Sequence, residues 1–203
     1  MNKEYTFLFN PNFRLQSKYL HVNSFLVDNE IIQTESQFSP LENKYVSNGS
    51  CSVIVIREIY DLSIIYSEQT KWENPRLQSW IRKQIKTYII DIAENVLPRR
   101  LHYWEKEKNL YAKNVLVKKL RSNVLGQCDN SKTICLSPRI ILLPQSSMDC
   151  VILHEMAHLK FMHHRKSFWN FLSELLGEDS VDQRARADVE NSKFYLYSKF
   201  LLK

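Results

Sequence analysis

Residues 154–158 constrain this chain more than any other stretch, because they read H-E-x-x-H inside a segment with a helical pattern. Apolar residues recur there at helix-like intervals and predict one buried stripe: Val151, Ile152, Leu159 and Met162. On such a helix His154 and His158 lie one turn apart on the same face. Two imidazoles so placed can bind one metal ion, with nitrogen–metal distances of about 2.0–2.1 Å for zinc. Glu155 would project beside the metal, where it suits a base that takes a proton from metal-bound water.

The same residues allow a second interpretation, in which the two histidines are hydrogen-bonded parts of a buried core and bind no metal. The density of histidine favours the metal site, since four of the six histidines of the chain lie between residues 154 and 164. A catalytic zinc ion takes three protein ligands and leaves a fourth position open. The third ligand is therefore expected at His163 or His164.

Helix geometry does not decide between His163 and His164. At about 100° per residue, an unbroken helix would turn His163 away from the first two histidines and place His164 well off their face. We therefore expect the helix to end near Phe161 and Met162, so that the chain bends back under the metal, although no Gly or Pro marks a bend there. The alternative for both histidines is a solvated basic helix end, where such side chains complement the helix dipole.

The surroundings of the motif carry a resemblance to a known family. The features that carry it are Gly126-Gln127-Cys128, the strand-like residues 133–136, Pro144, H-E-x-x-H, His164 and Phe168-Trp169. In this order and spacing, residues 120–169 resemble the YgjP-like metal-dependent hydrolases, a zincin group that is also similar to the SprT-like and WLM metallopeptidases. A weaker similarity, in the order of helices and strands, extends back to residue 74. The chain departs from the family pattern at Leu125, where the family has Trp, and at Arg165, where it has Ser.

The resemblance implies an α+β, zincin-like fold, in which a small antiparallel sheet packs against helices and the H-E-x-x-H helix lies at the cleft. It implies that His154, His158 and His164 bind one Zn²⁺ ion per chain, with His163 at a position where the family usually has asparagine. It also implies a zinc-dependent hydrolase, in the first place a metallopeptidase, with Glu155 as the general base.

A peptide or protein is therefore the expected substrate. The strands at 115–120 and 133–136 are implied to rim the cleft, where an extended substrate could pair with a strand edge. One alternative is a metal-dependent hydrolase of nucleotides or phosphoesters, with the phosphate bound by nearby basic residues: Lys118, Lys119, Arg121, Arg165 and Lys166. Another is a nucleic-acid-associated protein with SprT-like protease character. A third is a non-enzymatic DNA- or protein-binding module with a degenerate site. The intact Glu155 argues against a degenerate site.

Composition bears on these alternatives. The formal net charge of +6 supports a nucleic-acid partner only weakly. With three glycines in 203 residues, the chain contains neither a G-x-G-x-x-G nor a Walker motif, which excludes a glycine-rich phosphate loop. The four cysteines lack C-x-x-C spacing, so we expect free thiols rather than a zinc cluster or a disulfide framework. Cys128 and Cys135 could nevertheless meet across a hairpin.

The N-terminal residues lack the basic region and apolar stretch of a signal peptide. No run of about 18 apolar residues predicts a membrane span. We therefore expect a cytoplasmic protein that does not contact a membrane. The sequence gives no indication of the oligomeric state.

Two regions are expected, a mainly β region at 1–73 and a zincin-like metallohydrolase core at 74–203, joined as one continuous domain. In the first, strands are predicted at 5–9, 19–27, 51–59 and 62–66, with a polar loop at 34–50 and an isolated His21. Asn74-Pro75 predicts the start of a helix that continues to about Leu110, with a restart at Pro98.

The elements expected around the motif follow from turn and cap signals. They are a strand at 115–120, a turn region at 121–131 with Gly126, a returning strand at 133–136, a helix opened by residues 144–147 with Ser147 as its cap, a helix at 165–176 stopped by Gly177, and a last helix at 180–202. In the helix at 165–176 four residues are predicted to face inward: Phe168, Trp169, Leu172 and Leu176.

Overall fold

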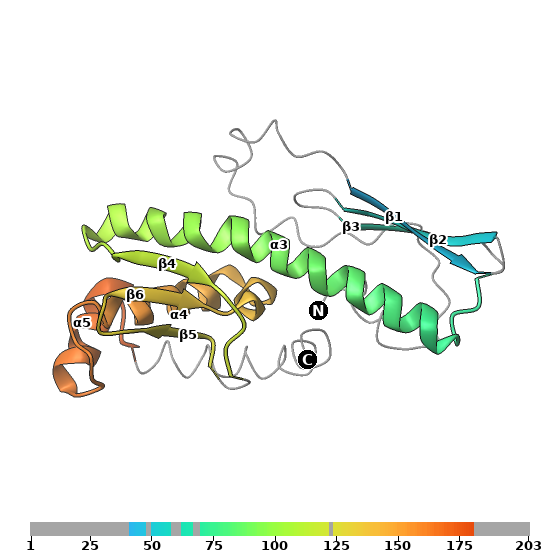
Figure 1. The fold of residues 1–203 in the computed structure, drawn as a ribbon. Coiled ribbons are helices and arrows are strands. Elements are labelled where there is room, and N and C mark those ends of the chain that lie inside the picture. The colour runs from blue at the N-terminus through green and yellow to red at the C-terminus, as the bar shows by residue number, and fades with distance from the viewer. Residues whose placement is uncertain (1–40, 48–49, 58–61, 67–69, 122–123, 181–203) are drawn as a thin grey trace. The chain divides into compact units, whose positions relative to one another are not determined.

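The computed structural model describes residues 41–180 apart from 48–49, 58–61, 67–69 and 122–123, and Figure 1 shows its elements. The chain divides into two compact units between Tyr88 and Ile89, within a long helix, and each unit is described by itself. The strands predicted at 5–9 and 19–27, His21 and nearly all of the last predicted helix lie outside the described residues.

The first unit contains an antiparallel sheet in the order β1-β2-β3. Its strands are β1 (Leu41–Ser47), β2 (Ser50–Arg57) and β3 (Leu62–Tyr66). Val53 and Val55 of β2 are fully buried, as the continuous apolar run of this strand predicts. The strands predicted at 51–59 and 62–66 are confirmed in their described residues, but the loop predicted at 34–50 is wrong at Leu41–Ser47 and Ser50, which lie in strands. The polar residues of β1 are compatible with a strand because β1 lies at the edge of the sheet.

The long helix α3 (Pro75–Lys108) begins where the sequence predicts. The Arg76 N–H donates to Asn74 Oδ1 over 2.9 Å, so Asn74 caps the helix ahead of its first residue, Pro75. The predicted restart at Pro98 is wrong, because α3 continues through this residue. Burial of the neighbouring Leu97 and Leu101, both 0% exposed, holds the helix together where proline removes one backbone hydrogen bond.

The second unit contains a mixed sheet in the order β4-β6-β5. Its strands are β4 (Asn114–Val117), β5 (Gly126–Cys128) and β6 (Thr133–Leu136). The central strand β6 is buried along its whole length, and it pairs parallel with β4 and antiparallel with β5. The expected antiparallel sheet is thus corrected to a mixed one. The reason is that the three-residue β5 lies within the predicted turn region, so that β6 runs antiparallel to β5 and parallel to β4.

The described residues of this unit also contain three further helical segments: η2 (Pro138–Leu142), α4 (Gln145–Ala157) and α5 (Lys166–Leu176). Helix α4 contacts α5, η2, β5 and β6. Ser147 does not cap α4, because the N-cap position is occupied by Pro144, which makes no side-chain cap bond. Gly177 ends α5 with φ 74°, as predicted. None of the described helices is long and apolar enough to span a membrane.

A buried ion pair fixes α4 to the second half of α3. Arg100 of α3 donates from Nε and a terminal nitrogen to the two carboxylate oxygens of Asp149 in α4, over 2.7 and 2.6 Å. The Trp104 indole N–H donates to the same carboxylate over 2.9 Å. Three directed bonds on one carboxylate restrict both the rotation and the sliding of α4, which carries the H-E-x-x-H residues. The described part of the chain is therefore an α+β structure with two small sheets.

Candidate metal site

The H-E-x-x-H residues lie at the C-terminal end of α4, and the chain leaves the helix directly after them. Ala157 is the last helical residue and His158 occupies the C-cap position. The Lys132 ammonium donates to the Leu159 carbonyl over 2.6 Å, which satisfies a carbonyl that the ended helix leaves without a partner of its own. The helix thus ends about one turn before the expected Phe161 and Met162. The Lys132 side chain, which comes from the turn between β5 and β6, stabilises this end.

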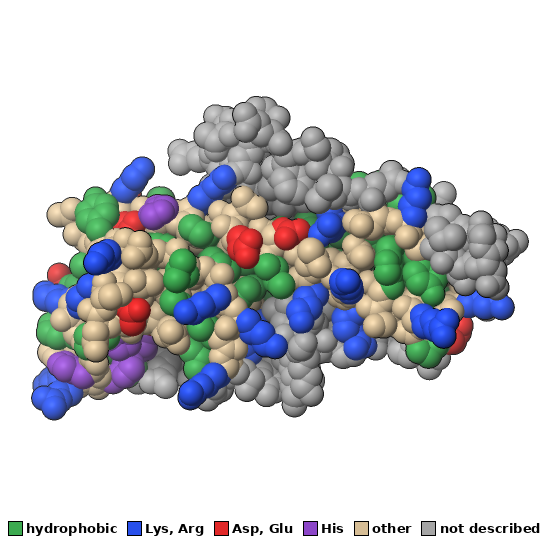
Figure 2. Space-filling view, in the orientation of Figure 1, with side chains coloured by type: hydrophobic (Ala, Val, Ile, Leu, Met, Phe, Trp, Pro, Cys, Tyr) green, Lys and Arg blue, Asp and Glu red, His purple; other side chains and the backbone are tan. Residues whose placement is uncertain are grey.

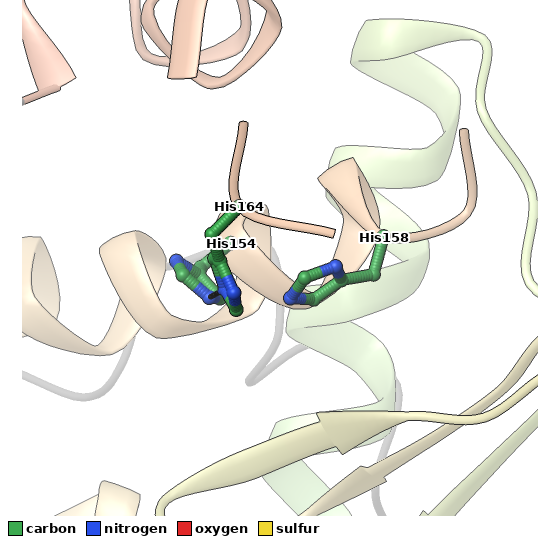
Figure 3. Close-up of side chains that lie close together, drawn as sticks. All are labelled: His154, His158 and His164. Carbon is green, nitrogen blue, oxygen red and sulfur yellow. Dashed lines mark hydrogen bonds between the residues drawn. The ribbon is translucent and has the colours of Figure 1, made fainter. Parts of the chain in front are cut away.

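The bend brings three histidines together. His154, His158 and His164 each present one ring nitrogen, and these nitrogens all lie within 4.8 Å of one another. Nε2 of His154 is 3.0 Å from Nε2 of His164, and Figure 3 shows the three rings converging. His158 is 9% exposed, whereas His164 is exposed, so the group opens to solvent on one side.

Hydrogen bonds orient two of these histidines. Nδ1 of His158 lies 2.8 Å from the Phe161 carbonyl oxygen. Because a carbonyl only accepts, Nδ1 carries the proton and Nε2 keeps its lone pair, which is the arrangement that metal-binding histidines require. The Trp169 indole N–H donates to the His164 carbonyl over 2.9 Å and so holds the backbone that carries the His164 ring.

The ring of Phe168 packs against the rings of all three histidines. Its ring centroid lies 5.0 Å from that of His154, 4.6 Å from that of His158 and 4.7 Å from that of His164. Phe168 is 0% exposed, as expected for a core residue of α5. Trp169 and Leu176, which were predicted to face inward with it, are only half-buried, and Leu175 is the buried residue instead. Helical periodicity predicted burial of Phe168 but gave no sign of its contact with the three histidines.

His163 lies outside the group. Its ring packs near that of Phe161, with centroids 5.8 Å apart, and its Nδ1 accepts from the Arg165 N–H over 3.3 Å. Of the two candidates that helix geometry left open, the structure brings His164 to His154 and His158.

The Glu155 side chain lies against β5. Its side chain is nearly buried, and the Cys128 N–H hydrogen-bonds its carboxyl group. Burial raises the pKa of Glu155 to about 8, and the bond from Cys128 acts in the opposite direction. Gly126 lies so close that a Cβ atom there would be 2.6 Å from Cγ of Glu155. No signal in the sequence predicted this close approach of Gly126 to Glu155.

The second unit contains three cysteines, of which Cys128 lies close to Glu155. Cys128, Cys135 and Cys150 are free thiols, so the expectation of free thiols is confirmed for these three. Cys128 is opposite Ile134 in the sheet and does not face Cys135. Burial, together with the nearby Glu155, raises the pKa of the Cys128 thiol to about 11. A thiol that stays protonated at neutral pH is a poor metal ligand and a poor nucleophile.

The three histidines fit a zinc-like ion. Tetrahedral coordination with bonds of about 2.0–2.1 Å separates neighbouring ligand nitrogens by about 3.3–3.4 Å. The observed separations, from 3.0 Å between two Nε2 atoms to at most 4.8 Å in the group, require only small rotations of the rings. Imidazole ligands suit zinc among the common divalent ions. Within the described residues, no other three metal-ligating side chains meet in this way.

The comparison with protein families agrees with this class of site. A family model described as "YgjP-like, metallopeptidase domain" matches residues 18–186. The chain therefore belongs to the YgjP-like family of metallopeptidase domains, and the resemblance predicted from residues 120–169 is confirmed. This membership supports a metal-dependent peptidase in general terms. No curated protein and no solved structure matches the chain.

Proposed function

We propose that this protein is a zinc-dependent peptidase in which His154, His158 and His164 hold one Zn²⁺ ion and Glu155 is the general base. The observation that carries the proposal is the convergence of three imidazole nitrogens within 4.8 Å at the end of α4. The membership of a metallopeptidase family supports the same class of chemistry. The zincin-like placement of an H-E-x-x-H helix at a substrate cleft is part of this proposal.

A zinc ion bound there would lower the pKa of a coordinated water to about 7 and polarise the carbonyl of the scissile bond. Glu155 would take a proton from the attacking water and then pass it to the leaving amine. Its burial suits this role, because a pKa raised towards the working pH makes the carboxylate a stronger base. A neighbouring dication would lower that pKa again, which would favour the carboxylate form that accepts the proton.

The strand β5 offers a place for an extended peptide. It is the last strand in the order β4-β6-β5, and it contacts α4 beside Glu155. A peptide that pairs with this edge would use backbone hydrogen bonds, with little demand on its sequence. In the space-filling view, histidine side chains form a small exposed group with Lys and Arg side chains next to it (Figure 2). Arg165 and Lys166 directly follow His164 in the chain and are exposed, and basic side chains of this kind could bind a phosphate group. The experiment must therefore also test nucleotide hydrolysis.

The test offers zinc-loaded full-length protein a mixture of peptides and a mixture of nucleotides, with products identified by mass spectrometry. The control is Glu155→Gln at equal zinc content. We expect cleaved peptide bonds from the wild type and a turnover about a hundredfold to ten-thousandfold lower in the variant. Nucleotide products without peptide products would favour the phosphoester hydrolase. Equal turnover in zinc-loaded Glu155→Gln would refute the role of Glu155 as the base.

A further inference from the structure

We propose that Gly126 is a positioning residue for Glu155: the missing side chain of Gly126 is what allows the Glu155 carboxyl group to lie against β5. A Cβ atom built on Gly126 would lie 2.6 Å from Cγ, 2.8 Å from Oε1 and 2.9 Å from Cδ of Glu155. Real Cβ atoms essentially never approach other heavy atoms this closely. The three nearest atoms all belong to the Glu155 side chain, which is therefore the first group that an added Cβ atom would meet.

The backbone does not explain a glycine at this position. Gly126 is a strand residue that pairs with Leu136, and among the described glycines only Gly177 has a positive φ. Any L-amino acid can adopt an ordinary strand conformation, and glycine inside a strand weakens it. The cost of glycine in β5 is therefore explained by the close approach of a side chain, which is a recognised reason for glycine in a strand.

The strand cannot easily move away from Glu155. At its start, the Ser137 N–H donates to the Leu125 carbonyl over 2.8 Å. At its end, Asp129 N–H donates to the Thr133 carbonyl over 3.1 Å, and Asp129 Oδ1 accepts from the Thr133 N–H over 3.0 Å. Because bonds to the central part of the sheet hold both ends of β5, an added side chain at residue 126 must displace Glu155 instead.

Glu155 has little room for that displacement. It is 6% exposed, and the atom nearest to the added Cβ is Cγ, close to the base of the side chain. A clash at Cγ cannot be relieved by turning the carboxylate alone, so the whole side chain must change rotamer and leave the Cys128 N–H that bonds it. Strand β5 thus supplies both the space and the hydrogen-bond donor that set the carboxyl position.

This inference rests on the proposed peptidase. In that enzyme, Gly126→Ala should change the position of the base without changing the binding of the metal. None of the three atoms nearest to the added methyl group belongs to the proposed ligands His154, His158 and His164. The variant should therefore keep its zinc while the base moves. We expect kcat to fall at least tenfold, with KM changed less than threefold and zinc content unchanged.

The kinetic test is a double-mutant cycle of Gly126→Ala and Glu155→Gln. If Gly126 acts through Glu155, then Gly126→Ala should change kcat less than twofold once Glu155 is already Gln, because the base is absent. Asn130→Ala is the matched control, since Asn130 is exposed in the turn that follows β5, and it should retain wild-type turnover. Wild-type kcat in folded, zinc-loaded Gly126→Ala would overturn the inference.

The contact itself is tested by stability, without any activity. Gly126→Ala should lower the melting temperature of the full chain by about 2–10 °C, as overpacking does. In a Glu155→Ala background the same change should lower it by less than about 1 °C, because the clash is gone. If Gly126→Ala fails to fold, the double variant with Glu155→Ala should fold again. Equal losses in both backgrounds, or a double variant that also fails to fold, would overturn the inference.

The two arms distinguish failure of the inference from failure of the proposed function. A wild type that cleaves no peptide refutes the peptidase, while the stability cycle still decides whether Gly126 sets the position of Glu155. Strong coupling between Gly126→Ala and Glu155→Ala in stability, together with an unchanged kcat, would leave the peptidase standing. It would show that the contact exists but that Gly126 does not position the base for catalysis.

Discussion

The imidazole of His158 lies stacked on the ring of Phe168, with centroids 4.6 Å apart and 28° between the ring planes. The same phenyl ring meets His154 and His164 edge to face. One buried side chain thus contacts all three proposed ligands from below. Rings packed in this way lose freedom before the metal binds, which lowers the cost of binding.

Phe168→Leu should therefore weaken metal binding by about tenfold to a hundredfold, the usual effect of a changed residue behind metal ligands. Leucine keeps most of the apolar volume, so the fold should survive. Competition with a fluorescent chelator measures the affinity, and Phe171→Leu on the same helix is the control. Phe171 packs on Phe161 and is not paired with any of the three histidines. Equal metal affinities of the two variants would show that the Phe168 ring does not organise the three histidines.

The buried Glu155 predicts a pH dependence of stability in the metal-free protein. Burial raises the pKa of Glu155 from 4.5 to about 8, so the folded state binds this proton more tightly than the unfolded state does. The contribution to the free energy of unfolding is then fully present below pH 4.5 and is lost as the pH rises to about 8. Glu155→Gln does not titrate and should lose less stability over this range.

Denaturant unfolding with a chelator present, at pH 5, 6.5 and 8, measures the difference between wild type and Glu155→Gln. The variant should become the more stable protein as the pH rises, by an amount of about 1–3 kcal/mol at pH 8. Glu174→Gln, which removes an exposed carboxylate, should run parallel to the wild type. Parallel curves for Glu155→Gln would mean that Glu155 is not buried as described.

Lys132 links the β5–β6 turn to the end of α4. Its ammonium donates to the Leu159 carbonyl over 2.6 Å, and the residue takes an uncommon positive φ of 63°. Lys132→Met keeps the apolar stem and removes the charge, so it should destabilise the protein by about 1–2 kcal/mol. Metal affinity should fall with it, since Leu159 directly follows His158. Thermal unfolding and the chelator competition measure both, with the exposed Lys113→Met as control. Unchanged stability would show that this bond does not secure the end of the helix.

The sequence predicted those parts of the structure that depend on local signals. Asn74-Pro75 marks the start of α3, and Gly177 marks the end of α5, because capping chemistry needs only a few neighbouring residues. The spacing of His154 and His158 predicts their common face in the same way.

The rest depends on contacts between residues far apart in the chain. The end of α4 at Ala157 has no Gly or Pro signal, and Lys132 bonds the carbonyl of Leu159 from 27 residues away. Helix periodicity left His163 and His164 open, and the choice of His164 came from the family resemblance. The strand β5 reads as a turn because its three residues carry no alternation, and it exists only as a partner of β6. Gly126 was assigned to the turn for the same reason.

The central claim is that His154, His158 and His164 bind one metal ion, and metal content tests it most directly. Zinc per chain is measured by inductively coupled plasma mass spectrometry on wild type, His163→Ala and His164→Ala after dialysis against a weak chelator. We predict about one zinc per chain in the wild type and in His163→Ala, and a loss of most of the zinc in His164→Ala, because three protein ligands complete a catalytic zinc site. A wild type without metal, or a greater loss from His163→Ala than from His164→Ala, would contradict the account.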